Sequence, residues 1–399
     1  MPLRPLILLS CLLHAYIGLR LLPALAVFTA AWVPLLIALL VSAASMPLPF
    51  VGARSQRGPL GEGWKWLGLL CMGWFSSMFV LTLVRDAGLL LAWAVTLAGG
   101  LSIDWPRWQS ASAAAVPLLA TLASLVGFLN ARRTARVVRI DVPIHNLPAG
   151  LEGFTIAQLS DIHVGTTIRR GYIQRIVDAV NALGADMVAI TGDLVDGTVH
   201  ELRDHIAPLG GLRARHGTFV VTGNHEYYAG VHAWIVELRR LGLRVLLNEH
   251  VVLQTRNVKG AQNDEEAFAS AIVVAGVTDF TAVHFDAAHA SDPHGALQGA
   301  PPLVRTRVLL AHQPRSAPAA ADAGYQLQIS GHTHGGQFFP WNLFVPMQQP
   351  FTAGLHKLRE MWVYTSRGTG YWGPPKRFGA PSEITLLRLV PAASAAPAL

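Results

Sequence analysis

Cysteine is almost absent from this sequence. The two cysteines, Cys11 and Cys71, both lie inside apolar stretches of the first third of the chain. Two cysteines cannot build a disulfide-dense scaffold, and the lack of any cysteine after residue 71 excludes a thiolate metal site in the later part. We expect both to be small buried apolar residues; a disulfide between them is the alternative.

Charged residues are also scarce. They make up 14% of the 399 residues, whereas 52% are hydrophobic, which excludes an ordinary soluble protein and indicates membrane segments. The formal net charge of +7 is unevenly placed, because residues 1–139 hold 11 Lys+Arg against 3 Asp+Glu and the remainder holds 20 against 21. The soluble part therefore lacks the basic excess that phosphates would attract, and we expect no nucleic-acid partner.

Long apolar runs occupy the first 139 residues. Several approach the roughly 20 residues that a bilayer core requires, which predicts about four transmembrane helices. The runs cover residues 5–19, 21–47 (after Arg20), 66–84 and 112–130. A shorter run, 88–101, is a fifth span, a re-entrant piece or an interfacial helix. A cleaved signal peptide is the alternative for the first run, but more spans follow it and no small-residue cleavage site precedes a soluble region.

Short basic loops predict the orientation. Positive residues gather on the cytoplasmic side of membrane proteins. They lie between the second and third runs and after the fourth: Arg54, Arg57, Lys65, Arg132, Arg133, Arg136 and Arg139. An even number of spans keeps both loops on one side, so we predict a multi-pass membrane protein with its later part in the cytoplasm. The alternative places that part outside.

After Arg139 the pattern becomes α/β. Short apolar strands alternate with a helical stripe at residues 168–184, and later strands follow with fewer helices, which predicts a second sheet packed on the first. The predicted strands cover residues 154–160, 186–192, 217–223, 271–276, 304–311, 325–330, 361–366 and 383–390. The predicted organisation is a membrane region over 1–139, an α/β domain over 140–392 and a disordered tail over 393–399. The segment 284–302, rich in Pro, Ala and His, is predicted to be an exposed loop.

Polar residues follow five of these strands. Strand ends in open α/β sheets are where ligands gather, so the five tips should converge. The tips are SDIH (160–163), GDLVD (192–196), GNHE (223–226), His312 and GHTHGG (331–336). A single Asp here is more often a helix N-cap and a single His a surface residue. Five tips that together offer oxygen and imidazole ligands without sulfur suit Mn²⁺, Fe or Zn²⁺.

The ordered set DIH, GDLVD, GNHE, His312 and GHTH resembles the motifs of the calcineurin-like metallophosphoesterases over roughly residues 150–390. The endings GHTHGGQ and SRGTGYWGPPKRFGAPSEIT resemble those of bacterial membrane-anchored members. The resemblance implies a metallophosphoesterase αββα sandwich of two packed mixed sheets.

The resemblance also implies a site with two divalent metal ions and a hydroxide between them as the nucleophile. Coordination lowers the pKa of water from about 15.7 toward 7, so that hydroxide exists at neutral pH. The residues implied are Asp161, His163 and His334 for one ion, Asn224, His312 and His332 for the other, and Asp193 as the bridge.

Other residues of the motifs have alternative roles. The resemblance assigns His225 to the phosphate and the leaving oxygen. Arg367 is a candidate phosphate clamp or a structural arginine, and Arg377 is a second candidate. Asp196 either orients a histidine or caps a loop. Glu226 favours a helix start. Tyr371 and Trp372 either shape a substrate wall or cover the sheet edge.

The predicted function is a membrane-anchored, metal-dependent hydrolase of phosphodiesters, phosphomonoesters or pyrophosphates, with a lipid-linked or a soluble substrate. One alternative is an inactive membrane sensor that binds metal or nucleotide. Another is a transporter with a regulatory domain, which the apolar runs disfavour because their few ionisable residues are His14, Arg20 and the pair Arg85 and Asp86, near the ends of the runs.

Overall fold

The computed structural model describes residues 3–27, 30–50, 59–100, 102–255, 268 and 270–392. The chain divides into two compact units, one made of Met1–Arg132 with Gly373–Phe378 and one of Arg133–Trp372 with Gly379–Leu399. The predicted tail 393–399, and Arg54 and Arg57 of the first basic loop, lie outside the described residues.

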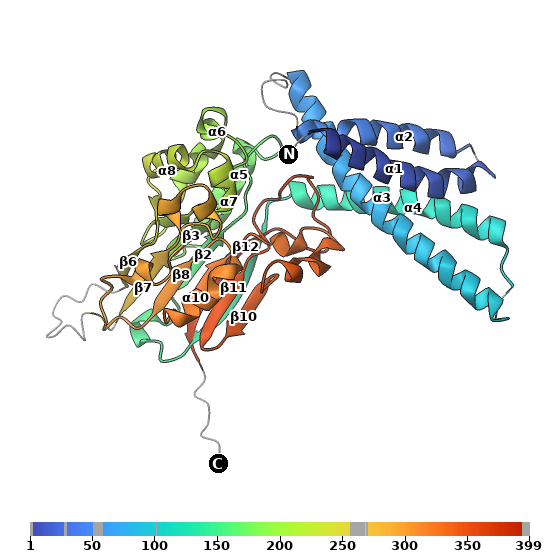
Figure 1. Ribbon diagram of the computed structural model, residues 1–399. Helices are drawn as coiled ribbons and strands as arrows, with labels where there is room; N and C mark the ends of the chain where they lie inside the picture. Colours follow the sequence, from blue (N-terminus) through green and yellow to red (C-terminus); the bar gives the residue numbers. More distant parts are fainter. Residues whose placement is uncertain are drawn as a thin grey trace, which may run out of the picture. The chain divides into compact units, whose positions relative to one another are not determined.

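The first unit, here called the helical unit, is built from long apolar helices (Figure 1). Among the described residues, four helices are long and apolar enough to cross a membrane. These spans cover Arg4–Ala26, Trp32–Phe50, Gly61–Leu97 and Trp105–Arg132. They correspond to α1 (Leu3–Ala26), α2 (Trp32–Ser45) together with the short helix η1 (Leu48–Phe50), α3 (Pro59–Leu97) and α4 (Trp105–Arg132). Pro59 suits the first position of α3, and Gly99, with a φ of 78°, follows its end. By their length and composition, these helices confirm the prediction of about four transmembrane helices.

The helix boundaries differ from the predicted ones in two places. Arg20 does not separate two spans: it lies within α1 and pairs with Asp86 of α3, with 2.7 Å from Nε to Oδ2. The run 88–101 is no separate element, because α3 continues through it to Leu97. The charge of Arg20 is thus balanced by a carboxylate of a neighbouring helix. The prediction that the ionisable residues lie near helix ends was wrong for Arg20 and Asp86.

The helices of this unit bury one apolar face and expose another. Ile17, Leu21, Leu39 and Met78 pack in its interior. Large apolar side chains also remain exposed, as expected where lipid surrounds a helix; they include Leu8, Leu12, Leu19, Leu40, Leu90, Leu91, Leu97 and Leu118. Both cysteines are free, and Cys11 is exposed rather than buried as predicted.

The second unit, here called the catalytic unit, contains two six-stranded mixed sheets within the described residues. One has the order β1-β12-β2-β3-β4-β5 and the other β10-β11-β9-β8-β7-β6. The strands of the first are β1 (Arg136–Ile144), β12 (Glu383–Pro391), β2 (Thr155–Leu159), β3 (Met187–Thr191), β4 (Thr218–Val221) and β5 (Arg244–Val245). Those of the second are β10 (Gly354–Leu358), β11 (Met361–Thr365), β9 (Leu327–Ser330), β8 (Arg307–Leu310), β7 (Ala271–Gly276) and β6 (Glu249–Gln254).

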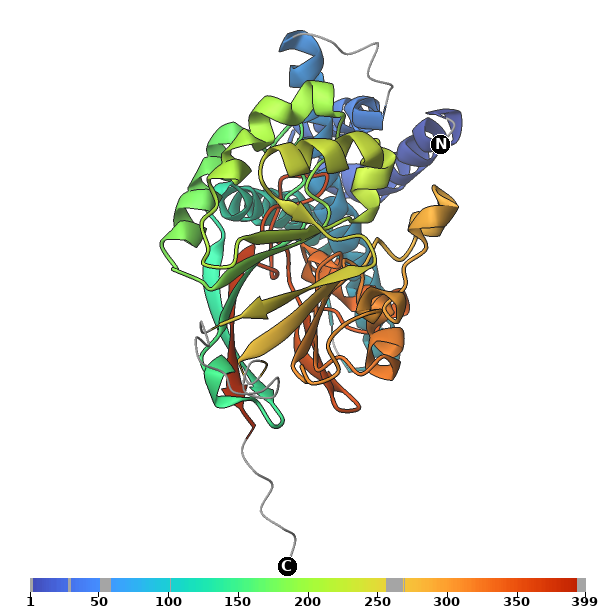
Figure 2. The same cartoon turned by 90° about the vertical axis from the view of Figure 1, so that its left-hand side faces the viewer.

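The two sheets pack face to face with helices outside, as Figure 1 and Figure 2 show. Apolar residues of both sheets form one core, for example Ile156 and Phe219 against Val274 and Leu310. The helices over the first sheet are α5 (Arg170–Asn181), α6 (Val199–Ile206), α7 (Asn224–Tyr228) and α8 (Val231–Arg240), and α10 (Ala317–Asp322) packs on the second. The predicted αββα sandwich is confirmed. β1 begins at Arg136, before residue 140, because it pairs with β12 along its whole length.

The parallel strands bring the predicted tips to one edge. β2, β3 and β4 are parallel neighbours, and so are β8 and β9. The carboxyl ends of β2 and β9 meet, since Gln158 Nε2 donates to the backbone carbonyl of Ser330 over 2.8 Å. The loops after these strands therefore project into one region of the catalytic unit.

Candidate metal centre

The loops after the strands hold their polar residues in an unusual backbone conformation. Five of the residues predicted as metal ligands have φ between 51° and 70°, the left-handed region that costs most residues energy. They are Asp161, His163, Asp193, His332 and His334. Such strain gathers at functional sites, where the surrounding structure imposes it to aim side chains.

One group of side chains contains Asp161, His163 and His334, all buried. The Nε2 atoms of the two histidines lie 3.0 Å apart, and His334 Nε2 lies 3.6 Å from Asp161 Oδ1. Two ligands that each bond an ion at about 2.1 Å lie about 3.0 Å apart when their bonds meet at a right angle. The spacing of this group is that of ligands around a single ion.

A second group contains Asp193, His312 and His332. His312 Nε2 lies 3.1 Å from Asp193 Oδ2 and 3.1 Å from His332 Nδ1. Asp193 Oδ2 also lies 3.8 Å from His163 Nε2 of the first group. One carboxylate oxygen thus faces both groups, and the two histidines of GHTH belong to different groups.

Hydrogen bonds from the far side of the rings set the histidine tautomers. Nδ1 of His163 bonds Asp196 Oδ1 at 2.9 Å, and Nδ1 of His312 bonds the carbonyl of Thr191 at 2.8 Å. A ring that donates from Nδ1 keeps the lone pair on Nε2, the atom that faces the cluster in both residues. Asp196 therefore orients a histidine, which is one of its two predicted roles.

Asn224 has a buried side-chain oxygen that lacks a hydrogen-bond partner within the described part of the chain, as a metal ligand would before it binds its ion. It is the first residue of α7, next to His225, whose backbone N–H donates to Asp193 Oδ1 over 2.9 Å. Its side-chain Oδ1 is buried and has no hydrogen-bond partner among the described residues. A buried orphan oxygen costs free energy unless a cation occupies its remaining lone pairs. The buried carboxylates, imidazoles and amide oxygen therefore fit a pair of divalent metal ions.

The charges in the cluster bias its histidines toward different forms. Burial, the largest effect, lowers the pKa of His332 to about 3, which keeps its imidazole neutral as a ligand must be. Burial lowers the pKa of His225, but the hydrogen bond to Asp196 (Nδ1 to Oδ1, 2.7 Å) and the charge of Asp193 outweigh it and raise the pKa to about 9. Burial raises the pKa of Asp196, but its two histidine partners, His163 and His225, outweigh this effect and lower the pKa to about 2.

Comparison with known proteins identifies the family. Residues 154–336 match the family model described as calcineurin-like phosphoesterase. The chain is 40% identical over 329 residues to the "Transmembrane protein with metallophosphoesterase domain" of Bos taurus, covering 80% of this chain and 72% of that protein. The chain belongs to the calcineurin-like phosphoesterase family.

Two further relatives mark the extent of the similarity. The Danio rerio protein with the same description is 37% identical, and the match covers 67% of this chain and 60% of that protein. An "Uncharacterized metallophosphoesterase" of Helicobacter pylori is 39% identical over 59% of this chain and 60% of its own length. The chain spans about three fifths of the length of these two relatives, so the matches do not cover their whole chains.

The phosphoesterase domain also relies on two buried carboxylates whose full roles the sequence did not reveal. Glu226 accepts hydrogen bonds from the backbone N–H groups of Asp193, Leu194, Val195 and Gly223, at 2.6–3.3 Å. It therefore fastens the GDLVD loop to the GNHE loop. Burial and the charge of Asp193 raise the pKa of Glu226 to about 7. The bond from Gly223 caps the start of α7, which confirms that Glu226 favours a helix start. No local pattern could have predicted the other three bonds, because their donors lie in the GDLVD loop.

Asp279 is the second such carboxylate. It is fully buried after β7, where it accepts from Gln313 Nε2 at 3.1–3.2 Å, and Gln313 follows His312 directly. A signal was available in this case: Asp279 follows a predicted strand as closely as the recognised tips do, but the family motifs do not include it.

The predicted substrate residues lie in three different settings. Arg367 is partly exposed, pairs with Glu383 (Nη1 to Oε2, 3.1 Å) and packs against Gly335 of the GHTHGG loop. Arg377 belongs to the helical unit, where its backbone bonds Gly127 of α4. The ring of Trp372 lies edge-on to that of His225 at 5.8 Å, so Trp372 borders the centre while Arg377 is held by α4.

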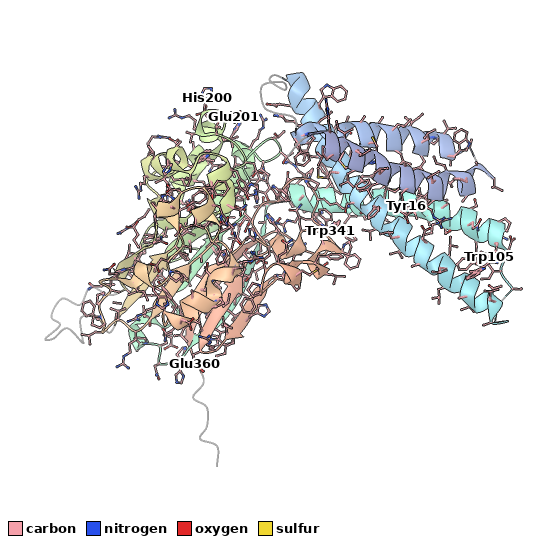
Figure 3. All side chains as sticks on the ribbon, in the orientation of Figure 1. Tyr16, Trp105, His200, Glu201, Trp341 and Glu360 are labelled. Atoms are coloured by element: carbon pink, nitrogen blue, oxygen red, sulfur yellow. The ribbon has the colours of Figure 1, made fainter. Side chains whose placement is uncertain are left out.

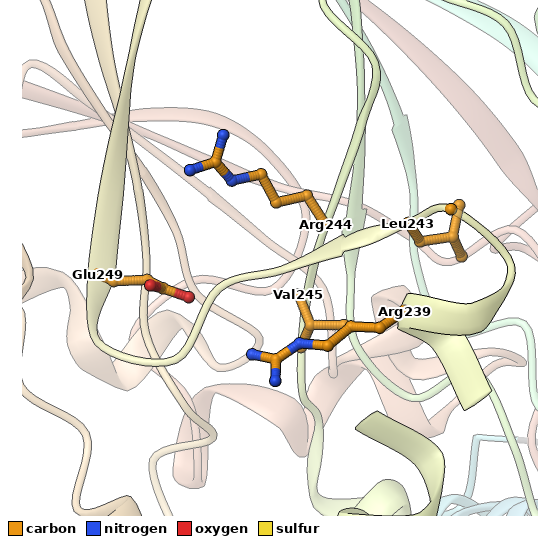
Figure 4. Close-up of a pocket in the computed structure, with 6 residues that line it drawn as sticks. Arg239, Leu243, Arg244, Val245 and Glu249 are labelled. Atoms are coloured by element: carbon orange, nitrogen blue, oxygen red, sulfur yellow. The ribbon is translucent and has the colours of Figure 1, made fainter. Parts of the chain in front are cut away.

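A hollow elsewhere in the catalytic unit contributes nothing to this centre. Figure 4 shows it between α8 and the strands β5 and β6. Its six lining residues, none of them histidine or aspartate, are Arg239, Gly242, Leu243, Arg244, Val245 and Glu249.

Proposed function

We propose that the chain is a membrane-anchored phosphoesterase that hydrolyses its substrate at two divalent metal ions. Asp193 faces both groups of ligands and would bridge the ions. The orphaned, buried Oδ1 of Asn224 carries the proposal, because a bound cation would supply the partner that this oxygen lacks. The ligands of the two ions would be Asp161, His163 and His334, and Asn224, His312 and His332.

The donor set narrows the identity of the ions. Carboxylate and amide oxygens with imidazole nitrogens suit Mn²⁺, Fe or Zn²⁺, and thiolate ligands are missing because the catalytic unit contains no cysteine. When bound, two such ions supply a hydroxide at neutral pH and neutralise the charge on the phosphoryl oxygens.

The protein's own groups complete the reaction. Hydrolysis adds the hydroxyl of water to phosphorus and breaks the bond to the leaving oxygen, which must gain a proton. His225 is protonated at neutral pH, with Nδ1 held by Asp196, so its Nε2–H is the group that would donate this proton. Arg367 would pair with a non-bridging phosphoryl oxygen, at the cost of its contact with Glu383.

Hydrolysis by the full-length chain tests the proposal. The purified chain, loaded with Mn²⁺ in detergent, should hydrolyse bis-p-nitrophenyl phosphate. Asp193→Asn should abolish the activity, and His225→Ala should lower kcat by about 10²–10⁴-fold with the metal content unchanged. His200→Ala, in an exposed histidine of α6 that Figure 3 labels, is the matched control and should retain the wild-type rate.

Folded, metal-loaded protein that hydrolyses no phosphoester, and that the two substitutions leave unchanged, would contradict the proposal. That outcome would favour the alternative of an inactive sensor that binds metal or nucleotide.

An exposed apolar segment supports a lipid-linked substrate. Directly after GHTHGG the chain reads QFFPWNLFVPM, and Met347 at its end is 80% exposed. Soluble surfaces seldom carry such a run, whereas Trp, Phe and Leu together favour the membrane interface. The exposed residues of this segment are Phe339, Trp341 (labelled in Figure 3), Leu343, Phe344 and Met347. Since the chain also carries membrane helices, the bilayer is the occupant proposed for this segment.

A comparison of two substrates tests the role of this segment. The chain is reconstituted in phosphatidylcholine vesicles that contain diacylglycerol pyrophosphate, and bis-p-nitrophenyl phosphate serves as the soluble substrate. The double substitution Phe344→Asp and Met347→Asp removes apolar burial worth a few kcal/mol, so hydrolysis of the lipid should fall about tenfold or more. Hydrolysis of the soluble substrate should stay unchanged.

Val236→Asp is the matched control, since Val236 is an exposed apolar residue of α8. An equal loss on both substrates, or no loss on the lipid, would contradict the lipid-linked substrate and leave the phosphoesterase proposal intact.

The cytoplasmic side is proposed for the catalytic unit. Lys65 precedes the apolar part of α3, and four arginines follow the apolar part of α4, namely Arg132, Arg133, Arg136 and Arg139. Positive residues close to helix ends favour the cytoplasmic side, and two helices between these loops keep both on that side.

A further inference from the structure

A second cluster of metal-binding side chains lies outside the phosphoesterase centre. It consists of His232, near the start of α8, with Asp286 and His289 of the segment predicted as an exposed loop. Each residue offers one ligand atom, and the three atoms lie within 4.8 Å of one another. The phosphoesterase motifs do not include any of these residues.

The distances in this cluster are close to those around one ion. His232 Nε2 lies 3.2 Å from Asp286 Oδ2, and His289 Nε2 lies 4.0 Å from the same oxygen. Tetrahedral ligands at about 2.1 Å from an ion lie about 3.4 Å apart. The His232 side chain is 73% exposed, and its distance to Asp286 already suits a shared ion. The longer distance, from His289 to Asp286, must shorten by about 0.6 Å when an ion binds both.

The other polar atoms of Asp286 and His289 are already bonded in the way that metal ligands require. Asp286 Oδ1 accepts from the backbone N–H of Ala288 at 2.9 Å, which leaves Oδ2 for an ion. His289 Nδ1 lies 2.9 Å from the hydroxyl of Tyr227, and donation from Nδ1 leaves the lone pair on Nε2. The backbone carbonyl of His289 accepts from Thr278 Oγ1 at 2.8 Å, so both the backbone and the ring of His289 are held by hydrogen bonds.

We propose that His232, Asp286 and His289 bind a third divalent cation, of the Zn²⁺ class. Two imidazoles and one carboxylate are a ligand set that Zn²⁺ takes in proteins, with the remaining position left to water. The alternative is a plain ion pair between protonated His232 and Asp286.

The third ion would link the loop to α8, which directly follows the helix α7 that carries Asn224 and His225. The ring of Tyr228, in α7, lies edge-on to His225 at 5.2 Å and to Phe285 at 5.5 Å. Phe285 directly precedes the ligand Asp286. An ion that fixes Asp286 and His289 to α8 would therefore hold Phe285 against Tyr228, at the border of the catalytic centre. The proposal does not depend on which substrate is hydrolysed.

Counting bound zinc tests the site without an activity assay. The full-length chain in detergent is stripped by a chelator and dialysed to equilibrium against micromolar free Zn²⁺, and zinc per chain is measured by mass spectrometry. The wild-type chain should bind three ions. His232→Ala and His289→Ala should each bind one fewer, whereas His284→Ala, an exposed histidine of the same segment, should match the wild type.

A second readout separates binding from misfolding. Zn²⁺ should raise the Tm of the wild-type chain by more than that of His232→Ala, whose Tm without metal should equal the wild-type value because the side chain is exposed. Equal zinc content in the wild type and His232→Ala would overturn the proposal, whatever number of ions the phosphoesterase centre holds. Loss of the third ion with bis-p-nitrophenyl phosphate hydrolysis retained would show that the two centres are separate.

Discussion

At the scale of single residues, Asp196 links the two kinds of chemistry in the centre. One carboxylate oxygen bonds Nδ1 of His163, a proposed ligand, and Nδ1 of His225, the proposed acid. A carboxylate behind a ligating histidine fixes the tautomer of the ring and raises its basicity. The same oxygen keeps His225 protonated, so that one residue supports both metal binding and proton donation.

Asp196→Asn should therefore weaken metal binding and activity together. The uncharged amide still reaches both rings but no longer favours their donor tautomers, and we expect affinity for Mn²⁺ to fall by about 10–100-fold, as measured by metal titration of the stripped chain. Asp141→Asn, in an exposed aspartate that pairs with Arg388, is the control. Unchanged affinity would show that Asp196 serves only to cap its loop.

The sequence predicts the proposed metal ligands better than it predicts the residues that hold the ligands and their loops in place. Asp161, His163 and the other ligands follow strands whose ends must meet, so their convergence follows from the fold class. Glu226 bonds backbone groups of a loop 30 residues earlier, and such bonds depend on coordinates that no local pattern contains. For Asp196 the sequence predicted two alternative roles, to orient a histidine or to cap a loop. The choice between them required the position of His163 in the structure.

At the scale of elements, the GHTHGG loop depends on close approach of the backbone to the β2 tip. A Cβ placed on Gly331 would collide with Ser160 Oγ and with Asp161 Oδ2, a proposed ligand oxygen. The backbone N–H of His332 donates to both oxygens of Asp161 at 2.9–3.0 Å. Gly331 thus lets one loop orient the carboxylate of another.

Gly331→Ala should displace Asp161 and lower metal content. We expect the purified variant to retain fewer than two ions in the centre after dialysis, with hydrolysis reduced in proportion. Gly171→Ala is the matched control, because a Cβ at Gly171 of α5 meets no atom within 4 Å. Full metal content in Gly331→Ala would mean that the two loops can move apart without loss of the ligand.

The helical unit includes one loop that is distant in sequence. Within this unit Lys376 Nζ donates to the carbonyl of Gly73 at 2.8 Å and to Ser77 and Ser124 at 2.5 Å and 3.2 Å. In the glycine-rich turn that contains this loop, Tyr371 and Trp372 were predicted to shape a substrate wall or to cover the sheet edge. The structure divides this turn: Trp372 borders His225, and Gly373–Phe378 packs on α3 and α4.

Gly127→Leu should loosen this packing. A Cβ at Gly127 would lie 2.6 Å from Lys376 Cγ, so a larger side chain overpacks the contact at a cost of about 1–3 kcal/mol. The expected result is a lower Tm of the full-length chain in detergent. Gly88→Leu in α3, where a Cβ meets no atom within 4 Å, should leave the Tm near the wild-type value. Equal Tm values for the two variants would refute a packing role for the loop.

At the scale of the whole molecule, the chain combines a hydrolytic centre with membrane helices. Composition predicts this division, since the apolar and basic part and the histidine-rich part are separate in sequence. Helix boundaries were harder to predict, because apolar runs show where a helix can lie in lipid but not where it ends. Arg20 interrupts an apolar run without ending α1, since Asp86 of another helix neutralises it.

A reporter fused after Leu399 tests the predicted orientation. A fluorescent protein that folds only in the cytoplasm should be bright at this position, because the arginines that follow α4 favour the cytoplasmic side. The same reporter fused after Asp104, between α3 and α4, should be dark. The opposite pattern would place the catalytic unit outside and restrict its substrates to that side of the membrane.

The most direct test of the central claim is to locate the ions by anomalous X-ray scattering from crystals of the Mn²⁺-loaded chain. The account predicts two peaks about 3.5–4 Å apart in the centre, with Asp193 between them. His334 should bind one ion together with Asp161 and His163, and His332 should bind the other together with Asn224 and His312. A single peak bonded to both His332 and His334 would contradict the two-metal centre.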